Sequence, residues 1–255
     1  MRSTIRVALL GAALCLSVPV VAHQAVANYA AAVAAPDRPE DARKLDESRQ
    51  PAKVLDFFGV KPGQTVADVM AGSGYYSELM AHVVGPKGKV IAYEPGQFYD
   101  NDAKEKAGWD ALKGRNPNVS LVTYPFDKFA APANSLDFTM LHMVYHDLYW
   151  ESTKYNVPRT DPAAFLKTLY AATKPGGEVG VVDHVGPAGD TRATVDKFHR
   201  IDPAVVKADF KAAGFVLEAE SDALHVAGDD HSKLVFDPAV RGKTDRFVYR
   251  FRKPK

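Results

Sequence analysis

Two glycines, Gly72 and Gly74, belong to a loop that can bind an anionic or nucleotide ligand. The loop reads Asp68-Val69-Met70-Ala71-Gly72-Ser73-Gly74 and lies between an apolar run and a helical pattern. Glycine lets backbone N–H groups approach a ligand closely because it has no Cβ. The start of the following helix adds unpaired N–H groups and a partial positive charge. The loop is therefore suited to a carboxylate or a phosphate.

A carboxylate follows 20 residues after Gly74, where Glu94 ends the apolar run Val90-Ile91-Ala92-Tyr93. A carboxylate at a strand end can accept two hydrogen bonds from a ribose diol. Glu94 and the glycine loop together predict a ligand that carries adenosine. Loops that bind nicotinamide cofactors usually have the pattern G-x-G-x-x-G/A, in which the third small residue lets the helix pack on the strand. Ser77 occupies that position here and does not match the pattern. The other features favour S-adenosylmethionine (SAM).

Further polar side chains follow two later apolar runs. Tyr145, His146 and Asp147 offer a hydrogen-bond donor, a base matched to neutral pH and an orienting carboxylate. The alternative is a helix start, with Asp147 as its cap and His146 packed near the surface. His184, next to Asp183, is a further catalytic candidate. Asp147, Asp183 and His184 could instead bind Mg²⁺ or Mn²⁺, but they have no ligand spacing, and we expect no metal.

Strand and helix patterns alternate along the chain and predict βαβ units around a mostly parallel sheet. Ligands of such sheets bind at the carboxyl ends of the strands, where the polar residues above would lie. A helical lead-in at 41–58 is interrupted at Pro51. The expected strands are 65–70, 89–93, 119–124, 136–141, 178–183, 215–219 and 246–251, and the expected helices are 75–84, 100–114, 162–173 and 203–213.

The amino-terminal segment has the pattern of a secretory signal. Arg2 and Arg6 precede an uncharged stretch at 7–22, and small residues suited to cleavage end at Ala22 or Ala27. An uncleaved anchor helix is the alternative. We expect a signal peptide at 1–27, a linker at 28–40 and a single domain at 41–255, in a protein that is exported to the periplasm or secreted.

Composition excludes several classes of protein. The chain has 255 residues, of which 46% are hydrophobic, so it can form a large core. Its net charge of +1 gives no electrostatic case for nucleic acid or an anionic membrane. Cleavage of the signal would remove the one cysteine, Cys15, and with it any thiol nucleophile or cysteine-ligated metal. A small molecule is the expected partner.

The stretch 66–221 resembles the class I SAM-dependent methyltransferases, above all members carrying a signal peptide. Five pieces occur in the family's order: VADVMAGSGYYSELMA, GKVIAYEP, SLDFTMLHMVYHDL, LKTLYAATKPGGEVGVVDHV and HRIDPAVVKADFKAAGFVLEAES. The resemblance implies a Rossmann-like, doubly wound, seven-stranded sheet with an antiparallel last strand. It also implies SAM as cofactor and methyl transfer to an unidentified small molecule. The alternatives are an inactive binding protein of the same fold in the periplasm and a nicotinamide-dependent oxidoreductase.

The resemblance also implies roles for particular residues. Gly72 and Gly74 would lie along the methionine part of SAM, Asp68 would act on its ammonium group, and Glu94 would hold its ribose. Met70 departs from the family's first glycine, and the segment after 141 would line the acceptor side. Asp127 is a shifted match to the acid near adenine. The expected cofactor-binding residues are Asp68, Ala71, Gly72, Ser73, Gly74, Glu94 and Asp127.

Overall fold

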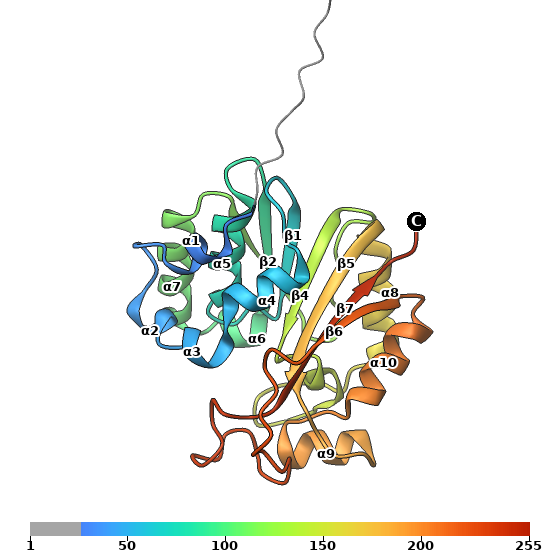
Figure 1. The fold of residues 1–255 in the computed structure, drawn as a ribbon. Helices are drawn as coiled ribbons and strands as arrows, with labels where there is room; N and C mark the ends of the chain where they lie inside the picture. Colours follow the sequence, from blue (N-terminus) through green and yellow to red (C-terminus); the bar gives the residue numbers. More distant parts are fainter. Residues whose placement is uncertain (1–26) are drawn as a thin grey trace, which may run out of the picture.

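A seven-stranded sheet in the order β3-β2-β1-β4-β5-β7-β6 crosses the centre of the molecule (Figure 1). The computed structural model describes residues 27–255. The strands are β1 (Thr65–Val69), β2 (Lys89–Pro95), β3 (Val119–Tyr124), β4 (Leu136–His142), β5 (Thr173–His184), β6 (Val216–Ser221) and β7 (Arg246–Arg252). Only β7 runs antiparallel, to both β5 and β6. The expected doubly wound sheet with an antiparallel last strand is confirmed.

Helices cover both faces of the sheet (Figure 1). Successive strand residues point to opposite faces, so Val66 packs in one apolar cluster and Ala67 in the other. The first cluster includes residues of α1 (Tyr29–Val33), α4 (Pro51–Phe58), α5 (Tyr75–Val84) and α7 (Ala103–Arg115). The second includes residues of α8 (Pro162–Ala172), α9 (Thr191–Phe198) and α10 (Pro203–Ala212). Both clusters bury large apolar side chains.

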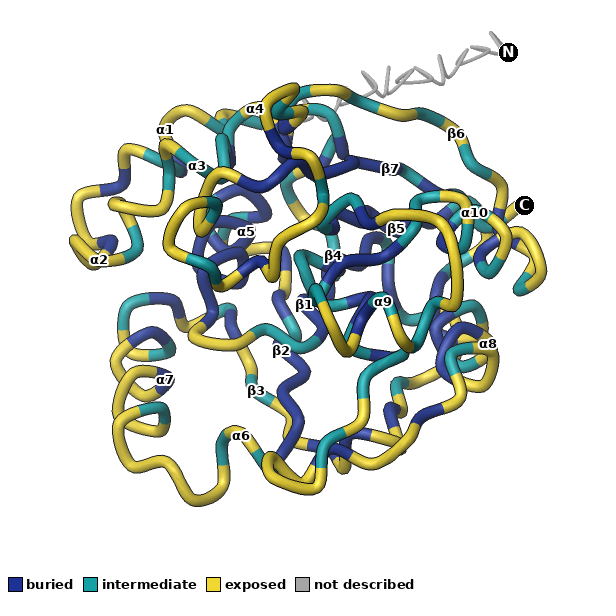
Figure 2. The backbone as a smooth tube through the Cα atoms, turned by 90° about the horizontal axis from the view of Figure 1, so that it is seen from below, coloured by how far each residue is buried: buried dark blue, intermediate teal, exposed yellow. Residues whose placement is uncertain are grey.

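The remaining helical elements are short: α2 (Glu40–Arg43), α3 (Asp46–Arg49), α6 (Gly96–Tyr99) and the 3₁₀ turn η1 (His146–Tyr149). Buried positions follow the central strands, whereas β6 at the sheet edge alternates between intermediate and exposed positions (Figure 2). No helix within residues 27–255 is long and apolar enough to cross a membrane.

The stretch expected to be a linker is in part folded. Tyr29–Val33 form α1, which Asn28 caps by accepting the Ala31 N–H at 2.9 Å. Ala32 is buried in the apolar cluster of α4 and α5, and the Tyr29 hydroxyl donates to the Val60 carbonyl at 3.0 Å. Residues 29–33 of the expected linker thus form a helix that packs on the domain. The expected signal peptide lies outside the described residues, apart from Ala27.

Candidate functional site

The loop between β1 and α5 is held from both sides. Met70, Gly72 and Gly74 all have positive φ angles, of 54°, 53° and 78°. The Gly72 N–H donates to Glu94 Oε2 at 2.8 Å, and Trp109 Nε1 donates to the Gly72 carbonyl at 3.0 Å. The loop thus joins the end of β2 to α7 through its own backbone.

The two glycines of this loop meet different surroundings. A Cβ at Gly74 would lie 2.5 Å from Leu112 Cδ1 and 2.9 Å from the Trp109 ring. Gly74 therefore allows α7 to pack on the loop. A Cβ at Gly72 would meet no atom within 4 Å, although Gly72 lines a cavity. Open space at Gly72 is what a bound ligand requires.

The cavity beside this loop has a volume of about 300 Å³ and lies at the carboxyl ends of β1 and β4. This volume falls at the lower limit of typical small-molecule sites. Its walls include Asp68, Met70, Ala71, Gly72, Ser73 and, from outside the loop, Arg49, Tyr76 and His142. Met70, which departs from the glycine expected at its position, is one of the lining residues.

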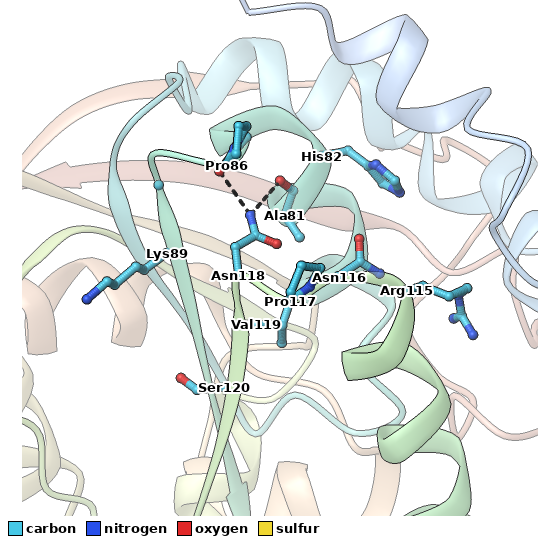
Figure 3. Close-up of a pocket in the computed structure, with 12 residues that line it drawn as sticks. Ala81, His82, Pro86, Lys89, Arg115, Asn116, Pro117, Asn118, Val119 and Ser120 are labelled. Atoms are coloured by element: carbon cyan, nitrogen blue, oxygen red, sulfur yellow. Dashed lines mark hydrogen bonds between the residues drawn. The ribbon is translucent and has the colours of Figure 1, made fainter.

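A larger cavity, of about 740 Å³, lies at the opposite edge of the sheet (Figure 3). It is lined by residues at the amino ends of β2 and β3, such as Lys89 and Val119. Asn118 spans part of it by donating to the carbonyls of Ala81 and Gly85, both at 3.0 Å. Open α/β sheets bind ligands at the carboxyl ends of their strands, so the smaller cavity is the candidate site.

Two buried carboxyl groups support the loop. Asp68 is 3% exposed and accepts a hydrogen bond from Ser77 Oγ at 2.7 Å. Burial raises the pKa of Asp68 to about 7. Glu94 is 4% exposed, and burial raises its pKa to about 8 although the Gly72 N–H favours the carboxylate. Glu94 contacts Gly72 from behind and does not itself line the cavity.

Several lining residues were not among the expected cofactor-binding or catalytic residues, and three of them, Arg49, Tyr76 and His142, carry polar groups that could contact a ligand. Tyr76 Oη and His142 Nε2 are buried and have no hydrogen-bond partner within the described chain, and their rings are 4.5 Å apart. Burial lowers the pKa of His142 well below its ordinary value, so the ring is neutral. Arg49, at the end of α3, lies over the Tyr75 ring at 4.3 Å. His142 ends a strand, a position that could have indicated it.

His146 lies between two carboxylates and does not line the cavity. Its Nδ1 is 2.8 Å from Asp183 Oδ1, and its N–H donates to Asp183 Oδ2 at 2.9 Å. Burial alone would lower the pKa of His146, but Asp147 and Asp183 outweigh it and raise this pKa to about 9. The ring is then protonated at neutral pH, so the expectation of a base at neutral pH has to be corrected.

Tyr145 lies against α10, away from the cavity. Its hydroxyl donates to Asp209 Oδ2 at 2.8 Å, and Tyr149 donates to the same oxygen at 2.5 Å. Tyr145 is buried, and burial raises the pKa of its hydroxyl well above the ordinary value. The expectation that Tyr145 serves the reaction directly is wrong in this geometry, because its hydroxyl is already paired.

The other expected residues are also outside the cavity wall. His184 Nδ1 is 2.8 Å from Thr244 Oγ1, and burial lowers the pKa of His184 to about 3. Asp147 lies beside His146 on η1. Asp127 follows β3 as an exposed residue. Neither Asp127, Asp147 nor His184 is brought to the cavity.

Comparisons with known proteins agree with this fold. Residues 43–123 match the family model of protein-L-isoaspartate(D-aspartate) O-methyltransferase. The ubiquinone/menaquinone biosynthesis C-methyltransferase UbiE of Ectopseudomonas mendocina is 29% identical over 143 residues, 55% of this chain and 50% of that protein. The same enzyme of Pasteurella multocida is 24% identical over 190 residues, 72% of this chain and 64% of that protein. The chain spans less than two thirds of these relatives.

Solved structures show the same architecture. A SAM-dependent methyltransferase from Aquifex aeolicus superposes with a TM-score of 0.59 at 24% identity, covering 85% of this chain and 98% of that one. The sheet order and the loop after β1 thus define the class I methyltransferase fold. The chain thus has the class I methyltransferase fold, and its sequence is similar to a methyltransferase family model over residues 43–123 and to curated C-methyltransferases over part of their length.

Proposed function

We propose that the chain binds SAM in the cavity at Gly72 and transfers its methyl group to a small molecule. The observation that carries this proposal is the glycine loop, which is tied to Glu94 and leaves open space at Gly72. The relatives named as C-methyltransferases support small-molecule methylation. The chain covers only part of their length, so the acceptor and its reacting atom are left open.

The residues around the cavity fit the proposed cofactor. Tyr76 Oη and His142 Nε2 are buried and have no hydrogen-bond partner among residues 27–255, and a polar ligand would provide such partners. Arg49 is a cation on the wall that would pair with the methionine carboxylate. Asp68, on the cavity wall, would favour the ammonium group, whereas Glu94 lies outside the wall and would act by holding the loop through the Gly72 N–H. Asp127 is not brought to the cavity, so an adenine contact from it would require the loop after β3 to move.

When bound, the cofactor would supply an electrophilic methyl group on a sulfonium. The chain would then hold the acceptor in line with that methyl group and exclude water, which provides much of the rate of such a displacement. The walls formed by Met143 and Val144 are apolar and suit this task.

Titration calorimetry with S-adenosylhomocysteine tests the cofactor site. We expect Arg49→Gln to weaken this ligand by roughly tenfold or more, because a charged hydrogen bond is lost. The same variant should bind 5′-methylthioadenosine as the wild type does, because that ligand lacks the carboxylate. Lys53→Gln, at an exposed position of α4, is the matched control. Absence of any binding to either ligand would overturn the proposal.

We also propose that residues 1–27 direct export and are cleaved. The charged start and the uncharged run that follows support this proposal. Mass spectrometry of the protein recovered from a periplasmic extract should give a chain beginning at His23 or Asn28. A full-length chain recovered only from the cytoplasm would contradict it.

A further inference from the structure

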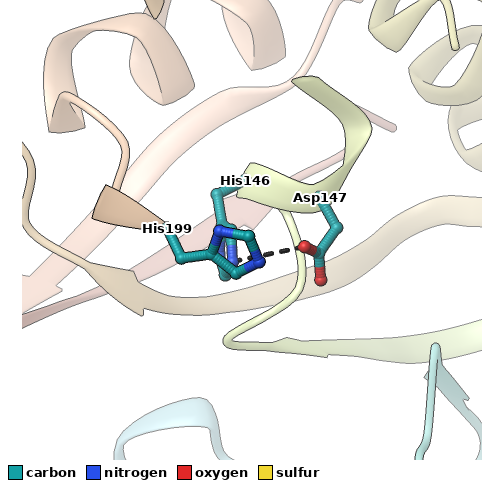
Figure 4. A group of neighbouring side chains, drawn as sticks. All are labelled: His146, Asp147 and His199. Carbon is teal, nitrogen blue, oxygen red and sulfur yellow. Dashed lines mark ion pairs between the residues drawn. The ribbon is translucent and has the colours of Figure 1, made fainter. Parts of the chain in front are cut away.

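Three side chains converge at the carboxyl ends of β4 and β5, outside the cavity described above (Figure 4). His146 and Asp147 belong to η1, and His199 follows the last residue of α9. One possible ligand atom from each lies within 4.8 Å of the others. His146 Nε2 is 3.3 Å from Asp147 Oδ1. Within residues 27–255 this is the one group of His, Cys, Asp or Glu side chains that meets this distance test.

Both imidazole rings have their Nδ1 atoms already engaged. His199 Nδ1 is 3.2 Å from the Val195 carbonyl, which can only accept, so Nδ1 donates. His146 Nδ1 faces Asp183, whose two oxygens also accept the backbone N–H groups of His146 and His184 at 2.9 and 2.7 Å. Asp183 therefore acts as an acceptor toward the ring as well. Each ring is left with Nε2 for another partner.

This arrangement is the one that metal-binding histidines commonly show. A ligating imidazole donates its second N–H to a carboxylate or a backbone carbonyl, which fixes its orientation. Asp183 does so for His146 and Val195 for His199. The two carboxylates, Asp147 and Asp183, carry the charge that balances a divalent cation. A metal ion at His146 Nε2 would take the place of the ring's second proton.

The neighbouring side chains hold the two imidazole rings in place and leave the cluster accessible to an ion. The His199 ring packs against Trp150 at 4.9 Å and Phe236 at 5.2 Å between ring centroids. The His146 side chain is 4% exposed, whereas that of Asp147 is 24% exposed. An ion can therefore reach the cluster from the side of Asp147.

We propose that His146, Asp147 and His199 bind one divalent transition-metal ion of the zinc class, with Asp183 as a positioning residue. Two imidazoles and one carboxylate suit Zn²⁺, Fe²⁺ or Co²⁺ better than Mg²⁺, which prefers oxygen ligands. Three protein ligands leave one coordination position for water or a substrate atom. The proposal replaces the expectation of no metal, and it is independent of SAM binding.

Competition with a chromophoric zinc indicator tests the site on the untagged full-length chain after removal of metal with a chelator. We expect one Zn²⁺ per chain. His199→Asn should lower the affinity by more than about 100-fold, and asparagine tolerates the φ of 50° at this position. Asp183→Asn should lower it by roughly 10–100-fold, as loss of an orienting partner does. Zn²⁺ binding should be unaffected by His225→Asn, whose ring is 2.9 Å from Asp245 but lies outside the cluster.

A second measurement uses Co²⁺ in place of Zn²⁺. Bound Co²⁺ should give visible ligand-field bands and quench the fluorescence of Trp150, which packs on His199. If circular dichroism shows that His199→Asn does not fold, the Zn²⁺ affinity of Asp147→Asn, which changes the more exposed ligand, tests the proposal instead. No Zn²⁺ bound by the wild type, equal affinity in the ligand variants, or a loss caused by His225→Asn would each overturn the proposal.

Discussion

Glu94 links the proposed site to the pH dependence of folding. Burial raises its pKa from the ordinary value of 4.5 to about 8, so the folded state binds more protons than the unfolded state between these pH values. Stability should therefore fall as the pH rises through this window. Glu94→Gln removes the titration, and its free energy of unfolding should exceed that of the wild type at pH 8 by on the order of 1–3 kcal/mol.

Urea unfolding at pH 5 and pH 8 measures this difference. Burial raises the pKa of Asp68 to about 7, so the ionisation of Asp68 also lowers the free energy of unfolding as the pH rises. This smaller decrease should remain in Glu94→Gln. Asp127→Asn, at an exposed carboxyl group, is the matched control and should keep the wild-type pH dependence. An unchanged pH dependence in Glu94→Gln would show that Glu94 ionises normally in the fold.

Gly72 and Gly74 should respond differently to alanine. At Gly74 the new Cβ would meet Leu112 at 2.5 Å in a backbone of φ 78°, so Gly74→Ala should lose roughly 2–4 kcal/mol of stability. Gly72→Ala bears only the strain of φ 53°, about 1 kcal/mol, but places a methyl group at the cavity. Thermal unfolding with S-adenosylhomocysteine titration separates the two, and comparable losses of stability would contradict this assignment.

Residue types alone predicted the position of the glycine loop but not which polar side chains reach the cavity. Tyr145 is a hydrogen-bond donor in the sequence, yet its partner Asp209 lies 64 residues further along and becomes visible only in the fold. Tyr76 and His142 line the cavity because of where α5 begins and β4 ends. Long-range pairing thus decided which candidates remained available for chemistry.

At the scale of elements, η1 is fastened to α10 through Asp209. Tyr145 and Tyr149 both donate to its Oδ2, and the Tyr145 ring packs on Phe210 at 5.5 Å. Asp209→Ala leaves a buried hydroxyl without an acceptor and should cost about 1–3 kcal/mol in the free energy of unfolding. Affinity for S-adenosylhomocysteine should be unchanged, because neither tyrosine lines the cavity. A loss of ligand affinity without a loss of stability would show that Tyr145 contributes to the binding site.

Elements with a strong hydrophobic periodicity were predicted from the sequence, and elements whose hydrophobic periodicity is weak were not. All seven strands were expected close to their observed positions, because alternating or continuous apolar residues mark them. By contrast α9 buries only Val195, so its sequence has no apolar stripe. The strand expected at 178–183 begins earlier, since β5 starts at Thr173; within it Gly176 adopts a φ of 79° and its N–H donates to the Lys253 carbonyl at 2.8 Å.

At the scale of the whole molecule, the segment before α3 is tied to the wall of the cavity. The Arg38 guanidinium donates to both oxygens of Asp46, at 2.8 and 2.7 Å. Asp46 Oδ1 in turn accepts from the hydroxyl of Tyr75, a cavity residue over whose ring Arg49 lies. The Arg38 side chain is fully buried, so this ion pair is screened little by solvent. Part of the expected linker therefore supports the site.

Two truncations distinguish a linker from a structural segment. A chain that begins at residue 28 keeps α1 and Arg38 and should unfold as the full-length chain does. A chain that begins at residue 40 loses both and leaves the partly exposed Asp46 beside Tyr75 without its cation, which should cost roughly 1–3 kcal/mol. Arg38→Met isolates the ion pair from α1 and should cost part of that amount. Affinity for S-adenosylhomocysteine should fall with stability in the shorter chain, because Arg49 loses its support through Tyr75. Equal unfolding midpoints and equal affinities for the two truncated chains would show that residues 28–39 only connect the domain to what precedes it.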